Sequence, residues 1–512
     1  MKQELLDKEV LCIYDIRAIQ NFIFKSTRNT DILGGDRIVK TILQEALKSA
    51  LGDKSLGLKD DEYSLEEWGN AEYMPYFDDE RVKAQIITVA GGNAFMLYRT
   101  GRLCQAASRA FSRYLLKNTH TLEVAICAVE KTDNIHNDFN NLYLELDKVK
   151  SSDQSAQPLG AFPIVKKEEI TGNAISMFDS ETGEEISTET YLKRRKIKSS
   201  DTDLDSFDFC EDLKAYNKNI AYIHIDGNSM GLTIAKIMGK LKDYEKGVLA
   251  RRLLNINFQD NYVKVLTETE EWFYDVLKSE GVPADYYRYF YRRIHIGGDD
   301  INLVIASKYA LKFTEHFINE VSKRYVWSDD LVGTVYFSVC AGIGFVSADT
   351  SFKEGIPLAK ECCDTAKLEA KKPENLIDDK VGNWIDYQIN QDRLINSVTN
   401  VRDDSYVSLE GDSLCLRPYC LDKAREGTPT YYGNLKLYHN VLKQLIKSDK
   451  VLRGMIVAYS GERQDFMRAL NTYKMMGGKL PAEVGQPFVE IEGRDVACAT
   501  WYDAVELVMF GI

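Results

Sequence analysis

The stretch RRIHIGGDDINLVI, from Arg292 to Ile305, has an alternating or apolar run on each side of a Gly-Gly-Asp-Asp tetrad. This pattern predicts a β-hairpin whose turn is Gly297-Gly298 and whose second strand opens on Asp299 and Asp300. Mg²⁺ prefers oxygen ligands and is usually held by one or two carboxylates together with substrate phosphates. Acids beside glycines that lack side chains therefore suit a nucleotide–metal complex. The same tetrad also forms ordinary solvated turns, so on its own it leaves both interpretations open.

A second stretch upstream, IAYIHIDGNSMG, predicts a buried strand that ends on Asp226, with Gly227 and Gly231 opening a turn into a helix. In a βαββαβ domain the first and third strands are antiparallel neighbours, which brings Asp226 beside Asp299 and Asp300. Three converging carboxylates repel one another unless a cation neutralises them. The arrangement fits a two-metal nucleotidyl-transfer site, where one ion activates the attacking hydroxyl and the other neutralises the triphosphate and the leaving pyrophosphate.

The composition is that of an ordinary globular protein. The 512 residues predict three or four domains, and 44% hydrophobic with 28% charged residues argues against extended disorder. No run is apolar enough for a membrane span, and the charged start MKQELLDKEV is unlike a secretory signal, so we expect a cytoplasmic protein. Ten cysteines without a CxxC argue against a zinc knuckle or a disulfide framework. The net charge of -13 argues against a broad nucleic-acid-binding surface, although local basic patches remain possible.

The first 130 residues predict a second copy of the same domain. Residues 10–24, VLCIYDIRAIQNFIF, predict a strand that turns into a helix after Asp15, and a second helix is expected to start after Gly34-Gly35. Residues 85–98, QIITVAGGNAFMLY, repeat the strand, Gly-Gly turn, strand pattern. A helix over residues 102–117 and a strand over 122–129 complete the copy.

This first copy lacks the acids of the second, because Asn93 and Ala94 stand where they would be. Two such domains facing each other would frame a nucleotide pocket between them. The alternative is a degenerate domain with only a packing role, and we favour the pocket.

Residues 131–215 are polar and predict a linker or small insertion domain. Its basic run, 193–198, is expected to be solvated, with phosphate binding as the less favoured alternative. The run YYRYFYRR, 286–293, can stack bases but is better explained as strand and core. A helix over 357–371 presents Lys367 and Lys371, which can neutralise a triphosphate near the acids or lie on an exposed amphipathic face.

These motifs resemble, in order, the large palm-domain polymerase/cyclase subunit of type III CRISPR effector complexes and, more distantly, GGDEF-type nucleotide cyclases. The matching segments are DIRAIQNFIF with the GGD after it, AGGNAF, DGNSMG, GGDD, CAGI before a helix with an AK pair, WIDYQI and LRPY. Several ordered matches over most of the chain are more specific than any one of them.

The resemblance implies an α+β fold with two ferredoxin-like (βαββαβ) palms packed together, at 1–130 and 216–390, and a mostly helical domain at 391–512. It implies that the second palm condenses ATP into a cyclic oligonucleotide with Mg²⁺ or Mn²⁺. The implied metal ligands are Asp226, Gly227, Asp299 and Asp300, and the nucleotide-binding residues are Gly34, Gly35, Asn228, Ser229, Gly231, Gly297, Gly298, Lys367 and Lys371. Replacing Asp299 and Asp300 by alanine is expected to abolish activity and leave stability unchanged or slightly higher.

The chain also departs from the family pattern. The family's DGDNMG reads DGNSMG here, so Asn228 replaces an acid, and Cys340 stands where a serine is usual. The chain starts at the first palm without the family's nuclease domain, so DNA cleavage is not implied, and residues 165–198 contain no cysteine for zinc. The implied partners are nucleoside triphosphates, other type III subunits and RNA, with a homo-oligomer as a further possibility. The open alternative to a cyclase is a non-catalytic scaffold subunit of an RNA-guided complex.

Overall fold

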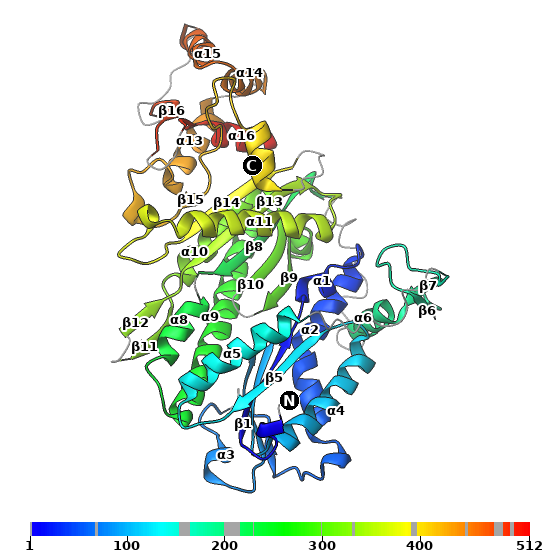
Figure 1. The fold of residues 1–512 in the computed structure, drawn as a ribbon. Coiled ribbons are helices and arrows are strands. Elements are labelled where there is room, and N and C mark those ends of the chain that lie inside the picture. Colours follow the sequence, from blue (N-terminus) through cyan, green and yellow to red (C-terminus); the bar gives the residue numbers. More distant parts are fainter. Residues whose placement is uncertain are drawn as a thin grey trace.

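The computed structural model describes residues 3–66, 70–152, 164–198, 216–228, 230–297, 300–329, 333–390, 397–445, 449–475, 485–491 and 496–512. Two mixed α/β units and a helical C-terminal part follow one another along the chain (Figure 1), which confirms the α+β fold predicted from the sequence. Ser229, Gly298 and Asp299 of the predicted site lie outside the described residues.

The first palm has the βαββαβ order. Its elements are η1 Gln3–Leu5, β1 Val10–Ile16, α1 Ile19–Ile23, α2 Asn29–Leu51, η2 Lys54–Leu56, β2 Tyr63–Ser64, α3 Pro75–Asp78, β3 Ala84–Ala90, β4 Asn93–Tyr98, α4 Gly101–Thr119 and β5 Val124–Glu130. The sheet order is β2-β3-β4-β1-β5, with β1 antiparallel to both β4 and β5. Every residue of β1 is buried, since VLCIYDI places side chains against helices on both faces of the sheet.

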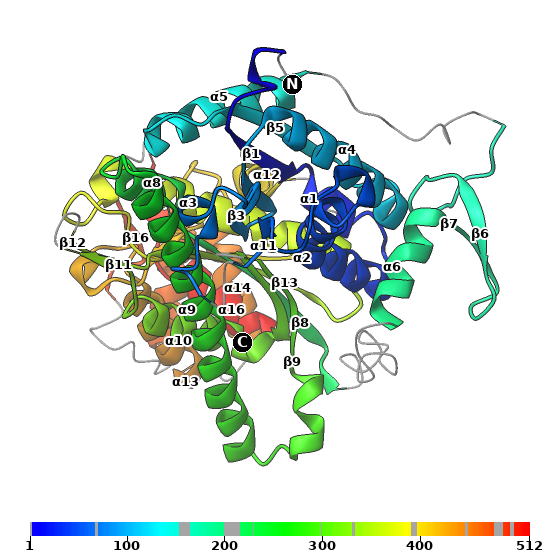
Figure 2. The ribbon, with the colours of Figure 1, turned by 90° about the horizontal axis from the view of Figure 1, so that it is seen from below.

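The next helix, α5 (Ile135–Ser151), belongs to the first palm rather than to a linker. Its apolar side chains Ile135, Phe139 and Leu142 share a core with Leu11 and Phe95 of the first sheet. The true insertion is a hairpin, β6 (Ile175–Asp179) and β7 (Glu184–Ser187), which projects from the body in Figure 2, followed by helix α6 (Thr188–Lys198). Helix α6 packs along α2 of the first palm.

The α2–α6 contact corrects two expectations. Helix α2 does not start after Gly34-Gly35, because both glycines lie inside it. A Cβ on Gly34 would overlap the main-chain carbonyl of Lys193, and one on Gly35 would crowd Ile23 and the Lys193 side chain. The basic run is not solvated at Lys193, which is 1% exposed and lies 2.6 Å from Glu189. The two glycines therefore serve helix packing, and we withdraw them from the proposed nucleotide site.

We expect Gly34→Ala to destabilise the protein by roughly 2 kcal/mol, because overpacking against a main chain outweighs alanine's better helix propensity. The matched control is Gly454→Ala in α14 (Asp449–Ser460), where an added Cβ meets nothing within 4 Å. Chemical denaturation should show the control equal to wild type or slightly more stable. Equal stability of both variants would contradict the packing role of Gly34.

The second palm repeats the same order with additions. Its elements are β8 Asn219–Gly227, α8 Met230–Met238, α9 Tyr244–Ser279, η3 Ala284–Tyr289, β9 Tyr291–Gly297, β10 Asp300–Ala306, α10 Ser307–Val321, β11 Tyr325–Asp329, β12 Gly333–Tyr336, β13 Val339–Ser347, α11 Phe352–Ala370, η4 Pro373–Asn375 and β14 Trp384–Ile389. The sheet order is β15-β14-β13-β8-β10-β9, where β15 is Tyr419–Cys420 of the C-terminal part, and β8 lies antiparallel between β13 and β10. In the YYRYFYRR run, buried Tyr291 and the Arg293–Glu270 ion pair confirm the interpretation as strand and core.

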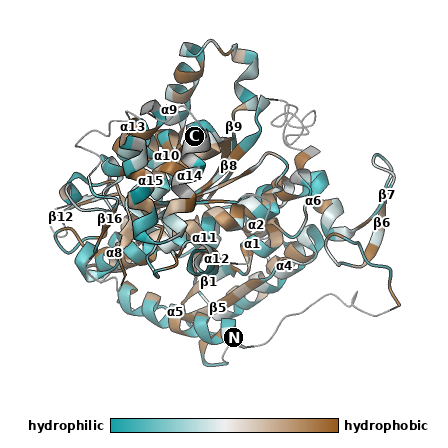
Figure 3. Cartoon of the chain, turned by 90° about the horizontal axis from the view of Figure 1, so that it is seen from above, coloured by the Kyte–Doolittle hydropathy of each residue, from teal (hydrophilic) through white to brown (hydrophobic). Residues whose placement is uncertain are grey.

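The two faces of this second sheet have different neighbours. Ile223 and Ile225 of β8, with Leu303 of β10, point into the core that includes α9 and α10. Tyr222 and Val304 point to the other face, where the core includes residues of α11 and α2. Figure 3 shows hydrophobic residues along β8, as expected for a strand buried on both sides. Polar side chains on the face of Tyr222 and Val304 therefore lie between the two palms.

The C-terminal part contains α12 Val398–Ser405, β15 Tyr419–Cys420, η5 Lys423–Arg425, α13 Tyr432–Leu445, α14, α15 Arg463–Met475, β16 Phe488–Val489, β17 Cys498–Ala499 and α16 Tyr502–Phe510. Strand β15 extends the second sheet beside β14, and Tyr419, Leu435 and Val505 belong to the same core as the second palm. This part is mostly helical, as predicted, but its described residues continue that core and form no separate one. In the part of the chain that the structure describes, no helix is both long and apolar enough to cross a bilayer.

The two palms are joined by buried polar contacts as well as by apolar packing. Arg252 of α9 is 1% exposed and donates hydrogen bonds to main-chain carbonyls of the first palm, including those of Ile86 and Ile87 in β3. On the other side, His295 of β9 pairs with Asp36 of α2. The strand that leads into the Gly-Gly-Asp-Asp turn therefore faces the first palm, as predicted.

Candidate active site

The Gly-Gly-Asp-Asp hairpin is shifted by one residue from the expected register. Gly297 is the last residue of β9 and pairs with Asp300, the first residue of β10, so Gly297 belongs to the strand and not to the turn as expected. In the first palm Ala90 pairs with Asn93 around its own two-residue turn. Asn93 therefore occupies the place of Asp300 in the duplicated architecture.

Asp226 and Asp300 meet at one end of the second sheet. Ile301 lies opposite Ile225, so Asp300 and Asp226, the next residues, lie side by side on neighbouring antiparallel strands. This confirms the predicted adjacency of these two acids. In the described ranges no three His, Cys, Asp or Glu side chains come together as a metal site, and Asp299 is outside those ranges. The three-acid cluster remains a prediction.

Lys367 of α11 forms an ion pair with Asp226, as its predicted position near the acids requires. Burial favours the neutral amine, but the Asp226 carboxylate outweighs it and raises the pKa of Lys367, so the lysine stays charged. Lys371 lies one turn further, exposed at the C-terminal cap of α11, and makes no ion pair with any described residue. Of the two predicted lysines, only Lys367 contacts the acids.

Asp300 is not an exposed turn residue, because two buried side chains contact it. Asn302 Nδ2 donates a hydrogen bond of 2.9 Å to Asp300 Oδ1, and His224 Nδ1 lies 3.2 Å from the same oxygen. His224 Nδ1 also lies 2.9 Å from Asn302 Oδ1, so this nitrogen faces two acceptors and carries the hydrogen. His224 and Asn302 are 1% and 2% exposed. This network orients the Asp300 carboxylate.

Sequence reasoning missed His224 and Asn302, although a signal existed. His224 precedes Asp226 by two residues and Asn302 follows Asp300 by two, and side chains two apart in a strand share a face. Polar residues repeated at that spacing inside IHIDG and DINLV marked one polar stripe across β8 and β10.

Asn228 has a structural role on the opposite edge of β8 from the hairpin. Its Nδ2 donates to Ser338 Oγ and to the Gly382 carbonyl, both at 2.9 Å, and its N–H donates to the Ser338 carbonyl. The side chain therefore ties β8 to the start of β13, away from Asp300. Gly227 pairs with Val339 at the end of β8, and Gly231 lies in the first turn of α8 with open space around it.

A second polar contact holds the hairpin from the side of the first palm. Burial opposes ionisation of Asp36, but hydrogen bonds and charge from His295 and Lys40 outweigh burial and lower the pKa of Asp36. A Cβ on Gly297 would overlap the His295 ring. A side chain at position 297 would therefore have to displace this imidazole, which Asp36 of the first palm holds in place.

We expect Asp36→Asn to increase amide hydrogen exchange in β9 by about 10- to 100-fold, because a buried charge-assisted contact is lost. Hydrogen-exchange mass spectrometry of residues 291–297 measures this. Asp7→Asn, which removes a charge from an exposed pair with Arg102, is the control and should leave β9 unchanged. Unchanged exchange in Asp36→Asn would show that the first palm does not hold the hairpin.

The first palm keeps part of the same arrangement. Asp15 is the penultimate residue of β1, as Asp226 is of β8, and Lys150 of α5 lies 2.8 Å from Asp15, as Lys367 of α11 pairs with Asp226. Helix α5 follows β5 and helix α11 follows β13, the last strand of each βαββαβ unit, so the lysines are related by the duplication. The first palm lacks an acid at the position that corresponds to Asp300, because Asn93 lies there opposite Asp15.

A small pocket of about 170 Å³ lies between the palms, at the first-palm hairpin. Gly91 and Asn93 line it from one side, and Met230, Asn255 and Phe258 from the other. Its volume is below the 300–1,000 Å³ of typical small-molecule sites. This pocket at the first-palm hairpin is too small, as it stands, for a nucleoside triphosphate, and the nucleotide pocket predicted between the palms stays a prediction.

No protein-family model matches the sequence, and no curated protein matches it. Solved structures do match. A Csm1-Csm4 cassette in complex with cA4 has a TM-score of 0.53 at 12% identity, covering 99% of this chain and 70% of that one. The apo Csm1-Csm4 cassette has a TM-score of 0.54 at 13% identity, covering 100% and 71%.

The likeness extends over both palms and the helical C-terminal part, because it covers nearly the whole chain. At these identities it concerns the fold. The chain has the fold of Csm1, a subunit of type III CRISPR complexes, which confirms the resemblance indicated by its motifs.

Proposed function

We propose that this protein is a nucleotidyltransferase that condenses ATP into a cyclic oligonucleotide, with its active site in the second palm. The observation that carries the proposal is the placement of Asp226 and Asp300 side by side on β8 and β10, with Lys367 beside them. Two carboxylates and a charged lysine at one sheet end are the groups that a triphosphate and its divalent cation require.

The residues present fit Mg²⁺ or Mn²⁺ by their chemistry. Hard divalent cations take carboxylate and carbonyl oxygens, which Asp226, Asp300 and the Gly227 carbonyl supply, and the sequence places Asp299 next to them. When bound, such an ion lowers the pKa of the attacking hydroxyl and neutralises the triphosphate. Lys367 then exchanges its Asp226 partner for phosphate oxygens, and His224 and Asn302 keep the Asp300 carboxylate oriented.

The first palm is proposed to contribute binding without metal chemistry. Asn93 has no charge to offer a divalent cation where Asp300 has one, and Lys150 already neutralises Asp15. In this proposal the first palm contributes to nucleotide binding, and the catalytic acids lie in the second palm. The cassette in complex with cA4 supports a cyclic oligoadenylate as the product class.

A scaffold role is the second candidate, and one observation favours it. Solved structures of this fold include cassettes of Csm1 with Csm4, so this fold assembles with a second subunit in those complexes. A chain with the same fold can bind a second subunit in such a complex without catalysing any reaction of nucleotides.

Incubating the purified protein with each nucleoside triphosphate, with Mg²⁺ or Mn²⁺, and with or without RNA separates the two. Mass spectrometry should detect a cyclic oligonucleotide and released pyrophosphate with ATP. If no triphosphate gives a product under any of these conditions, the scaffold role replaces the cyclase.

A further inference from the structure

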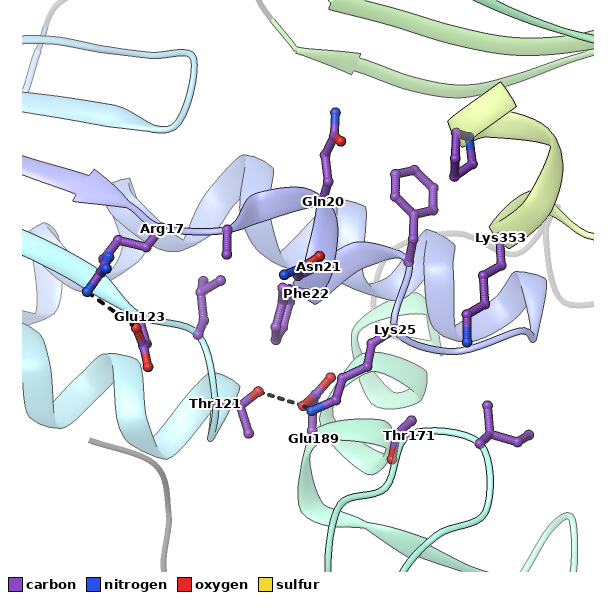
Figure 4. A pocket seen from close by; sticks show the side chains of 15 residues that line it. Arg17, Gln20, Asn21, Phe22, Lys25, Thr121, Glu123, Thr171, Glu189 and Lys353 are labelled. Carbon is purple, nitrogen blue, oxygen red and sulfur yellow. Dashed lines mark hydrogen bonds and ion pairs between the residues drawn. The ribbon is translucent and has the colours of Figure 1, made fainter. Parts of the chain in front are cut away.

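A larger pocket, of about 690 Å³, lies where the first palm, the insertion and α11 meet. We call it the α1 pocket, because the segment around helix α1 lines much of it (Figure 4). We propose that the α1 pocket binds a nucleoside phosphate without a metal ion, at a site separate from the proposed catalytic acids. The proposal goes beyond the cyclase function and does not depend on it.

The two sites are far apart along one helix. Lys353 in the first turn of α11 lines the α1 pocket, whereas Lys367 near the other end contacts Asp226. Fourteen residues separate them, which at 1.5 Å per residue is about 21 Å. A ligand in the α1 pocket therefore does not reach the carboxylates at the sheet end.

The charges of the α1 pocket favour an anion. Glu189 is 1% exposed and already satisfied, since Lys193 lies 2.6 Å from one oxygen and Thr121 donates to the other at 2.6 Å. Lys25 lies 3.5 Å from Glu189, and Lys353 makes no ion pair with any described residue. Glu189 is therefore shared by Lys193 and Lys25, and together with Lys353 these ammonium groups exceed the single carboxylate on this side of the pocket by two positive charges, in a chain whose net charge is -13.

The placement of these groups separates a cationic side from a neutral one. Figure 4 shows Lys25 and Lys353 on one side of the pocket, near Thr171, and Arg17 with Glu123 on the other. Arg17 and Glu123 neutralise each other at 3.7 Å. Phosphate oxygens are therefore expected between Lys25 and Lys353, since lysine binds phosphate as a point charge.

The apolar lining favours a ligand with a flat ring over a bare anion. Phe24, Leu122, Ile170 and Pro357 contribute apolar wall that an inorganic phosphate would leave uncovered. A base stacked on an aromatic ring gains about 1–3 kcal/mol. Asn21 lines the same pocket, and its amide has no hydrogen-bond partner among the described residues. An amide that offers both a donor and an acceptor matches an adenine edge.

The contacts of the two carboxylates in the α1 pocket indicate that the ligand binds without a metal ion. The two carboxylates that line the pocket are each engaged, Glu123 by Arg17 and Glu189 by Lys193 and Thr121. A divalent cation there would have to displace these contacts and would also be repelled by the ammonium groups of Lys25 and Lys353, two lysines that do not lie beside the proposed catalytic acids. Binding in the α1 pocket should therefore persist in a metal chelator, where a triphosphate–metal complex cannot form.

The test measures ATP binding by calorimetry in EDTA, using wild type and Asp300→Asn, whose proposed catalytic site is disabled. Both should bind ATP equally. Lys353→Glu should weaken binding by about 10- to 100-fold, since a phosphate contact becomes a repulsion. Lys246→Glu is the matched control, because Lys246 is equally exposed in the first turn of α9 and lines no part of the pocket.

Two further probes identify the ligand class. Phe24→Leu should weaken ATP binding but not binding of inorganic tripolyphosphate, and adenosine alone should bind more weakly than ATP. If tripolyphosphate binds as tightly as ATP in wild type, the pocket is only a polyanion site and the nucleoside part is wrong. Photo-crosslinking with azido-ATP should label residues 17–25 or 170–171.

Absence of ATP binding in EDTA, or equal binding by Lys353→Glu and wild type, would overturn the proposal. Its failure is distinct from failure of the cyclase, because product formation is measured separately with Mg²⁺. A wild type that binds ATP in EDTA but makes no oligonucleotide would refute the cyclase and leave the α1 pocket standing.

Discussion

Asp300→Asn is expected to lower the rate of nucleotide condensation by at least about a thousandfold, roughly 4 kcal/mol of transition-state stabilisation, while the protein stays folded. Asparagine keeps the shape of the side chain and one oxygen that accepts from Asn302, so the network with His224 survives. What disappears is the negative charge that a divalent cation needs between the attacking hydroxyl and the phosphate. The stability change should stay within about 1 kcal/mol.

Product formation by mass spectrometry and thermal melting on the same samples check this prediction. Asp285→Asn is the control, because Asp285 is exposed in η3 just before the hairpin strand and should change neither quantity. Wild-type turnover in Asp300→Asn would remove Asp300 from the site and with it the proposed chemistry.

The structure revises the expected effect of alanine at this position. The sequence suggested an exposed turn carboxylate whose removal is neutral or stabilising. Asp300 instead accepts from a side chain that is 2% exposed and lies near another that is 1% exposed. Alanine would leave these polar groups without their acceptor, at a cost of about 1–3 kcal/mol. Asparagine therefore separates loss of activity from loss of stability more cleanly than alanine does.

The sequence predicted the parts of the site that depend on strand order. Period-2 patterns and glycine turns identify a βαββαβ unit, and that topology alone places the end of β8 beside the start of β10. The sequence alone therefore predicted, through this topology, that Asp226 and Asp300 are adjacent. Lys367 was predicted from helix spacing and from the family resemblance, and its contact with Asp226 is confirmed.

Contacts between distant segments were not predictable in the same way. Gly34 and Gly35 looked like a loop before a helix, but they lie where α6, about 160 residues later, packs against α2. Asn228 looked like a ligand position, but its amide binds Ser338 and Gly382. Glycine and asparagine serve loops, sites and packing alike, so their sequence context does not distinguish these roles.

Arg252 is the clearest example of a contact between the palms that could not be predicted, because no sequence pattern indicated it. Its guanidinium is buried and donates five hydrogen bonds to main-chain carbonyls of the first palm, those of Glu66, Ala71, Tyr73, Ile86 and Ile87. Only arginine offers five donors in a rigid planar arrangement, so a single side chain from α9 joins β3 and the segment before it. The orientation of the two palms depends on this contact.

We expect Arg252→Met to destabilise the protein by roughly 3–5 kcal/mol, because several buried carbonyls lose their donor at once, and to lower the melting temperature by about 3–5 °C. Arg252→Lys should recover only part of the loss, since an ammonium group cannot reach carbonyls on both segments.

Lys264→Met, at an exposed position of the same helix, is the control for charge and size. Amide exchange should rise together in β3 and α9, because the palms separate where Arg252 joined them. If Arg252→Met melts at the same temperature as the control, the palms are held together by the remaining contacts between them, which are apolar packing and the Asp36–His295 pair.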